Sequence, residues 1–158
     1  MNNDNPYDSA AGENKTSIFV VIVNNTLRNL VCEFITRFSH LTVCGVACSV
    51  EEALVTIGQA PLQPEVALID VFAPEKDIPG IYLLKERYPS LHILAVSGYY
   101  KRETALNTLA AGADVYLMKE ELNELEQAVN EIMKGKHYIS QKVQSLLGDG
   151  QSIAKRSA

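Results

Sequence analysis

The sequence lacks the features that mark membrane, secreted and nucleic-acid-binding proteins. No apolar run reaches the roughly 20 residues that cross a bilayer, and residues 1–16 are polar and unlike a secretory signal. Basic residues are in the minority, with 14 Lys and Arg against 19 Asp and Glu, which argues against binding a nucleic acid through bulk charge. We therefore predict a cytoplasmic protein with no membrane segment and no direct DNA binding.

Patterns for metal binding and nucleophilic catalysis are also scarce. The three cysteines are Cys32, Cys44 and Cys48, and no two of them form a C-x-x-C pair. Cys44 and Cys48 could share a metal, but no further Cys or His completes a set of four ligands, so free thiols in a reducing compartment are the better interpretation. The three histidines are scattered along the chain. These residues give no reason to expect an enzyme.

The sequence does contain enough apolar residues for one folded domain. Of its 158 residues 47% are hydrophobic and 21% are charged, which is the composition of a globular protein. Residues 1–16 differ, because polar side chains dominate them, and a flexible leader is predicted there. Residues 17–140 are expected to form the domain, and residues 141–158 a short tail that is too small for a helix-turn-helix module.

Hydrophobic patterning predicts five units of a strand followed by a helix. Short, β-branched apolar runs predict strands at 17–23, 41–47, 66–70, 91–96 and 114–118. Helical spacing predicts helices at 27–38, 49–58, 81–88, 102–111 and 120–134, the second begun by a capping box of Ser49 and Glu52. The segment EKDIPG is predicted to be a loop. Strict alternation implies an α/β fold, a five-stranded parallel sheet with helices on both faces.

Polar residues stand where the predicted strands end, and this edge is where parallel sheets bind their ligands. Asn24 and Asn25 follow the first strand, Asp70 ends the third, Ser97 follows the fourth, and Lys119 follows the fifth. A carboxylate, a hydroxyl and an ammonium at one edge of a sheet could together carry out phosphoryl transfer. Asp70 could accept a phosphoryl group while Ser97 and Lys119 hold its oxygens. Each residue alone is ordinary turn or surface chemistry, so the prediction depends on their joint placement.

The chain also carries segments that resemble a known family. These segments are VEEAL, PEVALIDVFAP, LHILAVSGYY, AGADVYLMKEE and GKHYIS. Over residues 17–140 they resemble the receiver domain of bacterial response regulators, of the NarL/LuxR type. The resemblance implies a flavodoxin-like (βα)5 fold with Asp70 as phosphoacceptor, Ser97 as the phosphoryl sensor and Lys119 as the essential lysine. It also implies that Tyr116 is the switch aromatic, although a half-buried strand residue would look the same.

The sequence departs from this family at the metal site. Receivers hold Mg²⁺ with an acidic pair after the first strand, the phosphoacceptor, and a backbone carbonyl two residues later, here that of Phe72. The acidic pair is replaced by Asn24 and Asn25. Neutral amides remove most of the attraction for a hard cation, so Mg²⁺ binding is expected to be weak or absent. Pairing of Asp70 with Lys119 would weaken it further.

Two functions remain open from the sequence. One is a stand-alone response regulator that a histidine kinase or phosphotransfer protein phosphorylates on Asp70. It would signal to a downstream protein, alone or as a homodimer, through a surface formed by the fourth helix, fifth strand and fifth helix. The other is a pseudo-receiver, which binds a protein without phosphorylation, and the two asparagines favour it. A hydrolase or phosphatase ranks last, since neither a general acid nor an intact metal site is visible.

The resemblance also predicts how the response regulator would switch. On phosphorylation, Ser97 is expected to move toward the phosphoryl group and Tyr116 to turn inward, which changes the face of the fourth helix. Since residues 141–158 cannot hold a DNA-binding module, output must pass through another protein, unless the chain is a fragment of a longer one.

Overall fold

A five-stranded parallel sheet forms the centre of the protein, as the patterning predicted. The computed structural model describes residues 15–148, so residues 1–14 of the predicted leader and residues 149–158 of the expected tail lie outside the described residues. Thr16, which the sequence assigned to the leader, already belongs to the first strand. The strands are β1 (Thr16–Val21), β2 (Leu41–Ala47), β3 (Val66–Asp70), β4 (His92–Ser97) and β5 (Val115–Met118). They are parallel and lie in the order β2-β1-β3-β4-β5. The α/β fold class is confirmed.

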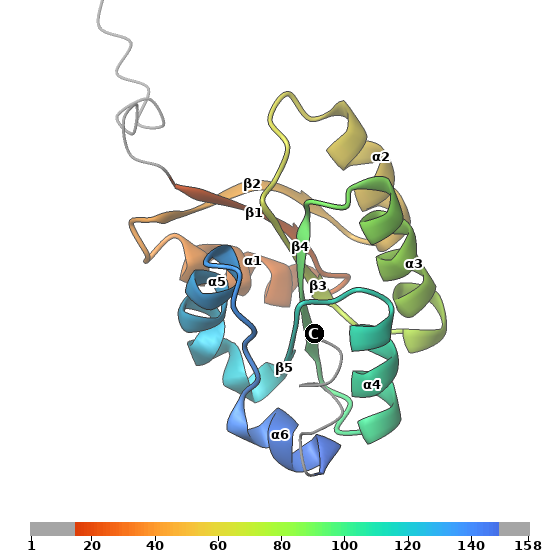
Figure 1. Cartoon of the computed structure of the whole chain (residues 1–158). Coiled ribbons are helices and arrows are strands. Elements are labelled where there is room, and N and C mark those ends of the chain that lie inside the picture. Colours follow the sequence, from red (N-terminus) through yellow and green to blue (C-terminus); the bar gives the residue numbers. More distant parts are fainter. Residues whose placement is uncertain (1–14, 149–158) are drawn as a thin grey trace, which may run out of the picture.

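Helices cover both faces of this sheet (Figure 1). The helices α1 (Asn25–Ile35) and α5 (Leu125–Met133) lie on one face, and α2 (Val50–Gln59), α3 (Pro74–Arg87) and α4 (Arg102–Ala110) lie on the other. Successive strand residues point to opposite faces. In β1, Ile18 and Val20 pack in the core on the side of α1 and α5, whereas Phe19 and Val21 pack on the opposite side. A strand buried on both faces must be apolar throughout, which is the pattern that predicted the sheet.

The third helix begins earlier than the sequence predicted. Helix α3 begins at Pro74 and includes the EKDIPG segment, so the prediction of a loop there was wrong. Proline is compatible with the first helical position, because the N–H that it lacks has no partner within the helix. The Asp77 carboxylate accepts the N–H groups of Phe72 and Ala73 at 2.9 and 2.8 Å, which stabilises the turn between β3 and the helix.

A glycine in the same segment allows α2 and α3 to pack closely. A Cβ atom at Gly80 would lie 2.7 Å from Cγ1 of Val50, at the beginning of α2. This glycine was interpreted as a loop residue, but its small size serves a contact between helices. The predicted start of α2 is confirmed, because the Ser49 side chain accepts the N–H of Glu52 at 3.1 Å.

The predicted helix at 120–134 is divided into two parts. A 3₁₀ helix, η1 (Lys119–Glu124), precedes α5, and within η1 the residue Glu121 has non-helical dihedral angles. The buried Glu121 carboxylate accepts the N–H of Met118 at 3.0 Å. This contact fixes the path of the chain as it leaves β5, and it places Lys119 at the edge of the sheet.

Residues that the sequence assigned to a tail form a further helix, α6 (Gln141–Leu147). It packs against α4 and β5, and Val143 and Leu147 are each 1% exposed within the core (Figure 1). The Arg102 guanidinium donates to the Leu147 carbonyl at 3.3 Å. The predicted boundary at residue 140 therefore separated a docked helix from its domain. In residues 15–148 no helix is long and apolar enough to cross a membrane.

Candidate functional site

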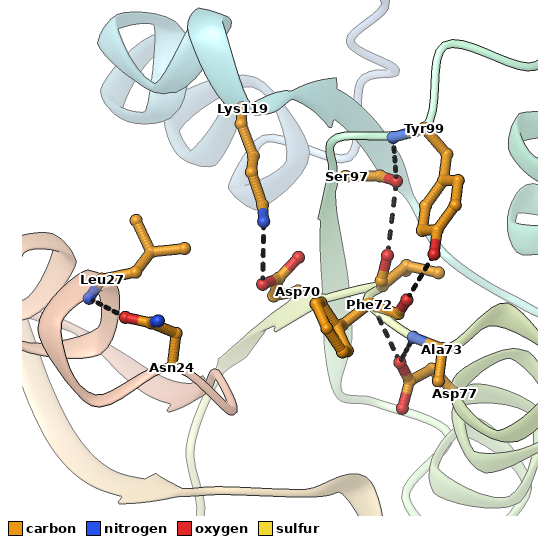
Figure 2. Close-up of polar contacts among 10 residues, drawn as sticks. Asn24, Leu27, Asp70, Phe72, Ala73, Asp77, Ser97, Tyr99 and Lys119 are labelled. Atoms are coloured by element: carbon orange, nitrogen blue, oxygen red, sulfur yellow. Dashed lines mark hydrogen bonds and ion pairs between the residues drawn. The ribbon is translucent and has the colours of Figure 1, made fainter.

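The ends of β3, β4 and β5 bring the predicted trio to one edge of the sheet (Figure 2). The Lys119 ammonium lies 3.3 Å from Oδ2 of Asp70. Ser97 lies at the same edge, where its hydroxyl accepts the N–H of Tyr99 at 2.9 Å and contacts the Val71 carbonyl at 3.4 Å. The structure thus pairs the carboxylate with the lysine, while the serine hydroxyl is bound to backbone groups of the neighbouring loops.

Asp70 is a buried carboxylate with one unpartnered oxygen. Its side chain is 3% exposed, and Oδ1 has no hydrogen-bond partner among the described residues. Burial raises the pKa of Asp70, the Lys119 ammonium opposes this shift, and the nearby Asp77 carboxylate adds to it. A buried acceptor without a donor is unfavourable and uncommon. The free oxygen is therefore a candidate for bonding to an incoming group.

We expect Asp70→Asn to raise the free energy of unfolding near pH 7. A raised pKa in the folded state means that ionised Asp70 costs stability, and this cost grows as pH rises through the folded-state pKa. The gain from the neutral amide should shrink as pH falls toward the ordinary value of 3.8. Urea unfolding at several pH values measures it. The control is Asp114→Asn, which removes a carboxylate paired with Lys85, and a pH-independent effect of Asp70→Asn would contradict the prediction.

A pocket of about 390 Å³ gives access to the Asp70–Lys119 pair. Its other walls are largely apolar and come from α1, the residues before it, and the loop after β3. They include Val23, Leu27, Leu30 and Phe72. A phosphoryl donor could therefore reach the carboxylate from this side.

The two asparagines of the expected metal site already have partners. Asn24 caps α1, where its Oδ1 accepts the N–H of Leu27 at 2.8 Å. The Oδ1 of Asn25 accepts a hydrogen bond from the Arg28 guanidinium. These contacts turn both amide oxygens toward the helix, and Arg28 adds a positive charge beside them.

The other two groups of that expected site also have partners, although Oδ1 of Asp70 has none in the described part of the chain. The Phe72 carbonyl accepts the Tyr99 hydroxyl at 2.9 Å, and Asp70 is paired with Lys119. Within residues 15–148, no three His, Cys, Asp or Glu side chains gather in a way that could hold a metal. The residues present do not fit a divalent cation, because three of the four oxygens are neutral and accept internal hydrogen bonds.

Sequence reasoning missed two residues of this edge, Tyr99 and Asp77. Tyr99 follows Ser97 by two positions, so its place near the edge was foreseeable, but the direction of its side chain was not. Asp77 lies in a segment that was interpreted as a loop. Its hydrogen bonds to the backbone before α3 cannot be predicted from the hydrophobic pattern of the sequence.

Tyr116 lies fully inside the protein. Its side chain is 1% exposed, so the interpretation of a half-buried strand residue is wrong. Its hydroxyl donates to the Tyr99 carbonyl at 3.1 Å. Burial raises the pKa of the Tyr116 hydroxyl, and the nearby Ser97 hydroxyl opposes this shift. The inward position is thus held by groups of this chain, and a movement on phosphorylation stays a prediction.

No family model matches the chain, but comparison with known sequences finds bacterial response regulators and a transcriptional activator. It is 29% identical over 134 residues to the DNA-binding transcriptional activator DevR/DosR of Mycobacterium tuberculosis. It is 30% identical over 130 residues to the response regulator GacA of Pseudomonas protegens. The alignments cover 82% and 80% of this chain, which spans 60% and 59% of the length of these relatives.

Solved structures show the same fold. A LuxR-family two-component response regulator from an Aurantimonas species has a TM-score of 0.79 at 21% identity, covering 87% of this chain and 99% of that one. The isolated REC domain of RcsB from Salmonella enterica serovar Typhimurium, with the phosphomimetic BeF₃⁻, has a TM-score of 0.75 at 16% identity. That alignment covers 85% of this chain and 99% of the RcsB domain.

The fold and the paired aspartate and lysine at its carboxyl edge define a class, the receiver modules of signal transduction. The sequence relatives are themselves named as response regulators or transcriptional activators. The described part of this chain is a response-regulator receiver domain of the two-component type.

Proposed function

We propose that this receiver accepts a phosphoryl group on Asp70 and signals through contact with another protein. The observation that supports the proposal best is the state of the Asp70 carboxylate. One of its oxygens pairs with Lys119, the other is buried and unpartnered, and the side chain lines an open pocket. This arrangement leaves one carboxylate oxygen without a hydrogen-bond partner among the described residues and places a cation beside the other oxygen.

These side chains suggest how phosphoryl transfer to Asp70 would proceed. A carboxylate oxygen of Asp70 attacks the phosphorus of the donor, and the bond from phosphorus to the leaving group breaks. From a phosphohistidine the leaving imidazole takes up a proton from water, whereas acetyl phosphate releases acetate as the anion. The aspartyl phosphate carries about −2 charge, which Lys119 offsets in part. The side-chain N–H groups of Asn24 and Asn25 could donate to phosphoryl oxygens, which carboxylates there would repel. We therefore expect slow transfer that depends weakly on Mg²⁺.

Intact-mass analysis tests this function. The full chain is incubated with acetyl phosphate, or with a candidate histidine kinase and ATP, with and without Mg²⁺. We expect one phosphoryl group per chain, added slowly and at a rate that Mg²⁺ changes little. If no phosphorylated species forms with either donor, phosphorylation of this receiver is refuted.

The second candidate is a pseudo-receiver that binds its partner without phosphorylation. The internal hydrogen bonds to the oxygens of Asn24, Asn25 and Phe72 favour it, because they replace the metal contacts of an ordinary receiver. Binding of a partner equally to the native chain and to Asp70→Asn would support this function over the first.

We expect the asparagine pair to be the main reason for weak Mg²⁺ binding. Asn24→Asp and Asn25→Asp should each raise the affinity for Mg²⁺ by about tenfold or more, because each adds a carboxylate ligand beside Asp70. Isothermal calorimetry measures the change. Asn29→Asp on the exposed side of α1 is the control, because it adds the same charge outside the pocket. Tight Mg²⁺ binding by the native chain that neither substitution improves would contradict the prediction.

A further inference from the structure

Tyr99 uses its backbone and its side chain to join three parts of the site. Its N–H donates to the Ser97 hydroxyl at 2.9 Å, and its own hydroxyl donates to the Phe72 carbonyl at 2.9 Å (Figure 2). Its carbonyl accepts the Tyr116 hydroxyl at 3.1 Å. We propose that Tyr99 is a positioning residue that couples the loop after β3 to the inward position of Tyr116.

The loop after β3 depends on hydrogen bonds for its position. The Phe72 side chain is 57% exposed, so packing contributes little to holding it. Its peptide groups are instead bound on two sides, the N–H by Asp77 at 2.9 Å and the carbonyl by the Tyr99 hydroxyl. Removing one of these contacts should therefore loosen the loop.

The other end of the coupling lies in the core. Since Tyr116 is 1% exposed, its hydroxyl would be costly to leave without an acceptor. That acceptor is the backbone carbonyl of Tyr99, so Tyr116 cannot leave its site without losing the contact or moving Tyr99. A displacement at Tyr116 is thereby transmitted to the Tyr99 hydroxyl and to Phe72.

This coupling goes beyond the proposed function. It rests on that function in one respect only, namely that a movement of Ser97 on phosphorylation would set the coupled groups in motion. The contacts themselves join groups of the unmodified chain. They should persist in Asp70→Asn, whether or not the native protein is ever phosphorylated.

Hydrogen exchange of the full chain, followed residue by residue by NMR, tests the coupling. Tyr99→Phe removes one hydroxyl and should speed exchange of the Phe72 and Ala73 amides by about three- to tenfold. Tyr116→Phe touches neither amide, yet it should speed their exchange in the same direction through Tyr99. The double variant should exchange no faster than the faster single variant, because both changes break one connected path.

The matched control is Tyr100→Phe, the same change in a neighbouring tyrosine that is 56% exposed. The same measurements in an Asp70→Asn background separate this proposal from phosphorylation, and we expect the same pattern there. The proposal is overturned if Tyr99→Phe behaves like Tyr100→Phe. It is equally overturned if Tyr116→Phe leaves the Phe72 and Ala73 amides unchanged, or if the two variants act additively.

Discussion

Replacing Asp70 with asparagine is expected to abolish phosphorylation of the chain completely, since the amide offers no nucleophilic carboxylate oxygen. Lys119→Ala should slow the reaction by about a hundredfold, which is the usual cost of removing one donor to a developing negative charge. This loss should be large because, among the described residues, Lys119 is the cation that lies against the carboxylate, at 3.3 Å.

Intact mass and peptide mapping after incubation with acetyl phosphate measure both effects. Lys142→Ala is the matched control, because Lys142 also pairs with an acidic residue, Glu120, but lies on α6 and is 53% exposed. Its rate should equal that of the native chain. A phosphorylated species that persists in Asp70→Asn would show that the acceptor lies elsewhere, and an unchanged rate in Lys119→Ala would remove that residue from the mechanism.

Leu147→Ala should lower the free energy of unfolding by about 2–4 kcal/mol, because it removes a fully buried side chain from the contact between α6 and the rest of the core. Leu147 is 1% exposed and packs in the core cluster that also contains Ala105 of α4. The loss should be accompanied by faster amide exchange in α4, because α6 covers part of that helix.

Urea unfolding and hydrogen exchange of the full chain measure these changes. Gln144→Ala, on the exposed side of α6, is the control and should alter stability by no more than about 0.5 kcal/mol. An effect of Leu147→Ala as small as that of the control would mean that α6 is not docked. The prediction bears on output, because α6 lies over part of the surface that the sequence had assigned to a partner.

The sequence alone predicted the five strands, because a strand buried on both faces must be apolar over its whole length. Residues 66–69 show this most clearly, since all four are 0% exposed in β3. Once the sheet is parallel, the carboxyl ends of its strands share an edge. The meeting of Asp70 with Lys119 therefore followed from their positions after the third and fifth strands, about fifty residues apart in sequence.

Local contacts, in contrast, changed the predicted boundaries. A proline and a glycine suggested a loop before residue 81, but a helix begins at Pro74, because Asp77 binds the N–H groups before it and Gly80 fits against Val50. Helix α6 has 7 residues, too few for a reliable helical pattern or for stability alone. It forms where α4 and β5 provide a surface on which its two buried residues can pack.

The chain's sequence by itself determined the sheet, the layers of helices, and the edge at which the acidic and basic residues meet. Only the tertiary structure decided which oxygens of that edge remain free. Asparagine and backbone oxygens accept hydrogen bonds from any donor within reach, and residue type does not reveal which donor that is. Leu27 and Arg28 became those donors locally, in the first turn of α1, whereas Tyr99 became one through the packing of the loop after β4. Apolar periodicity is set by burial over a whole element, whereas a hydrogen bond depends on the direction of single groups, which the folded chain alone fixes.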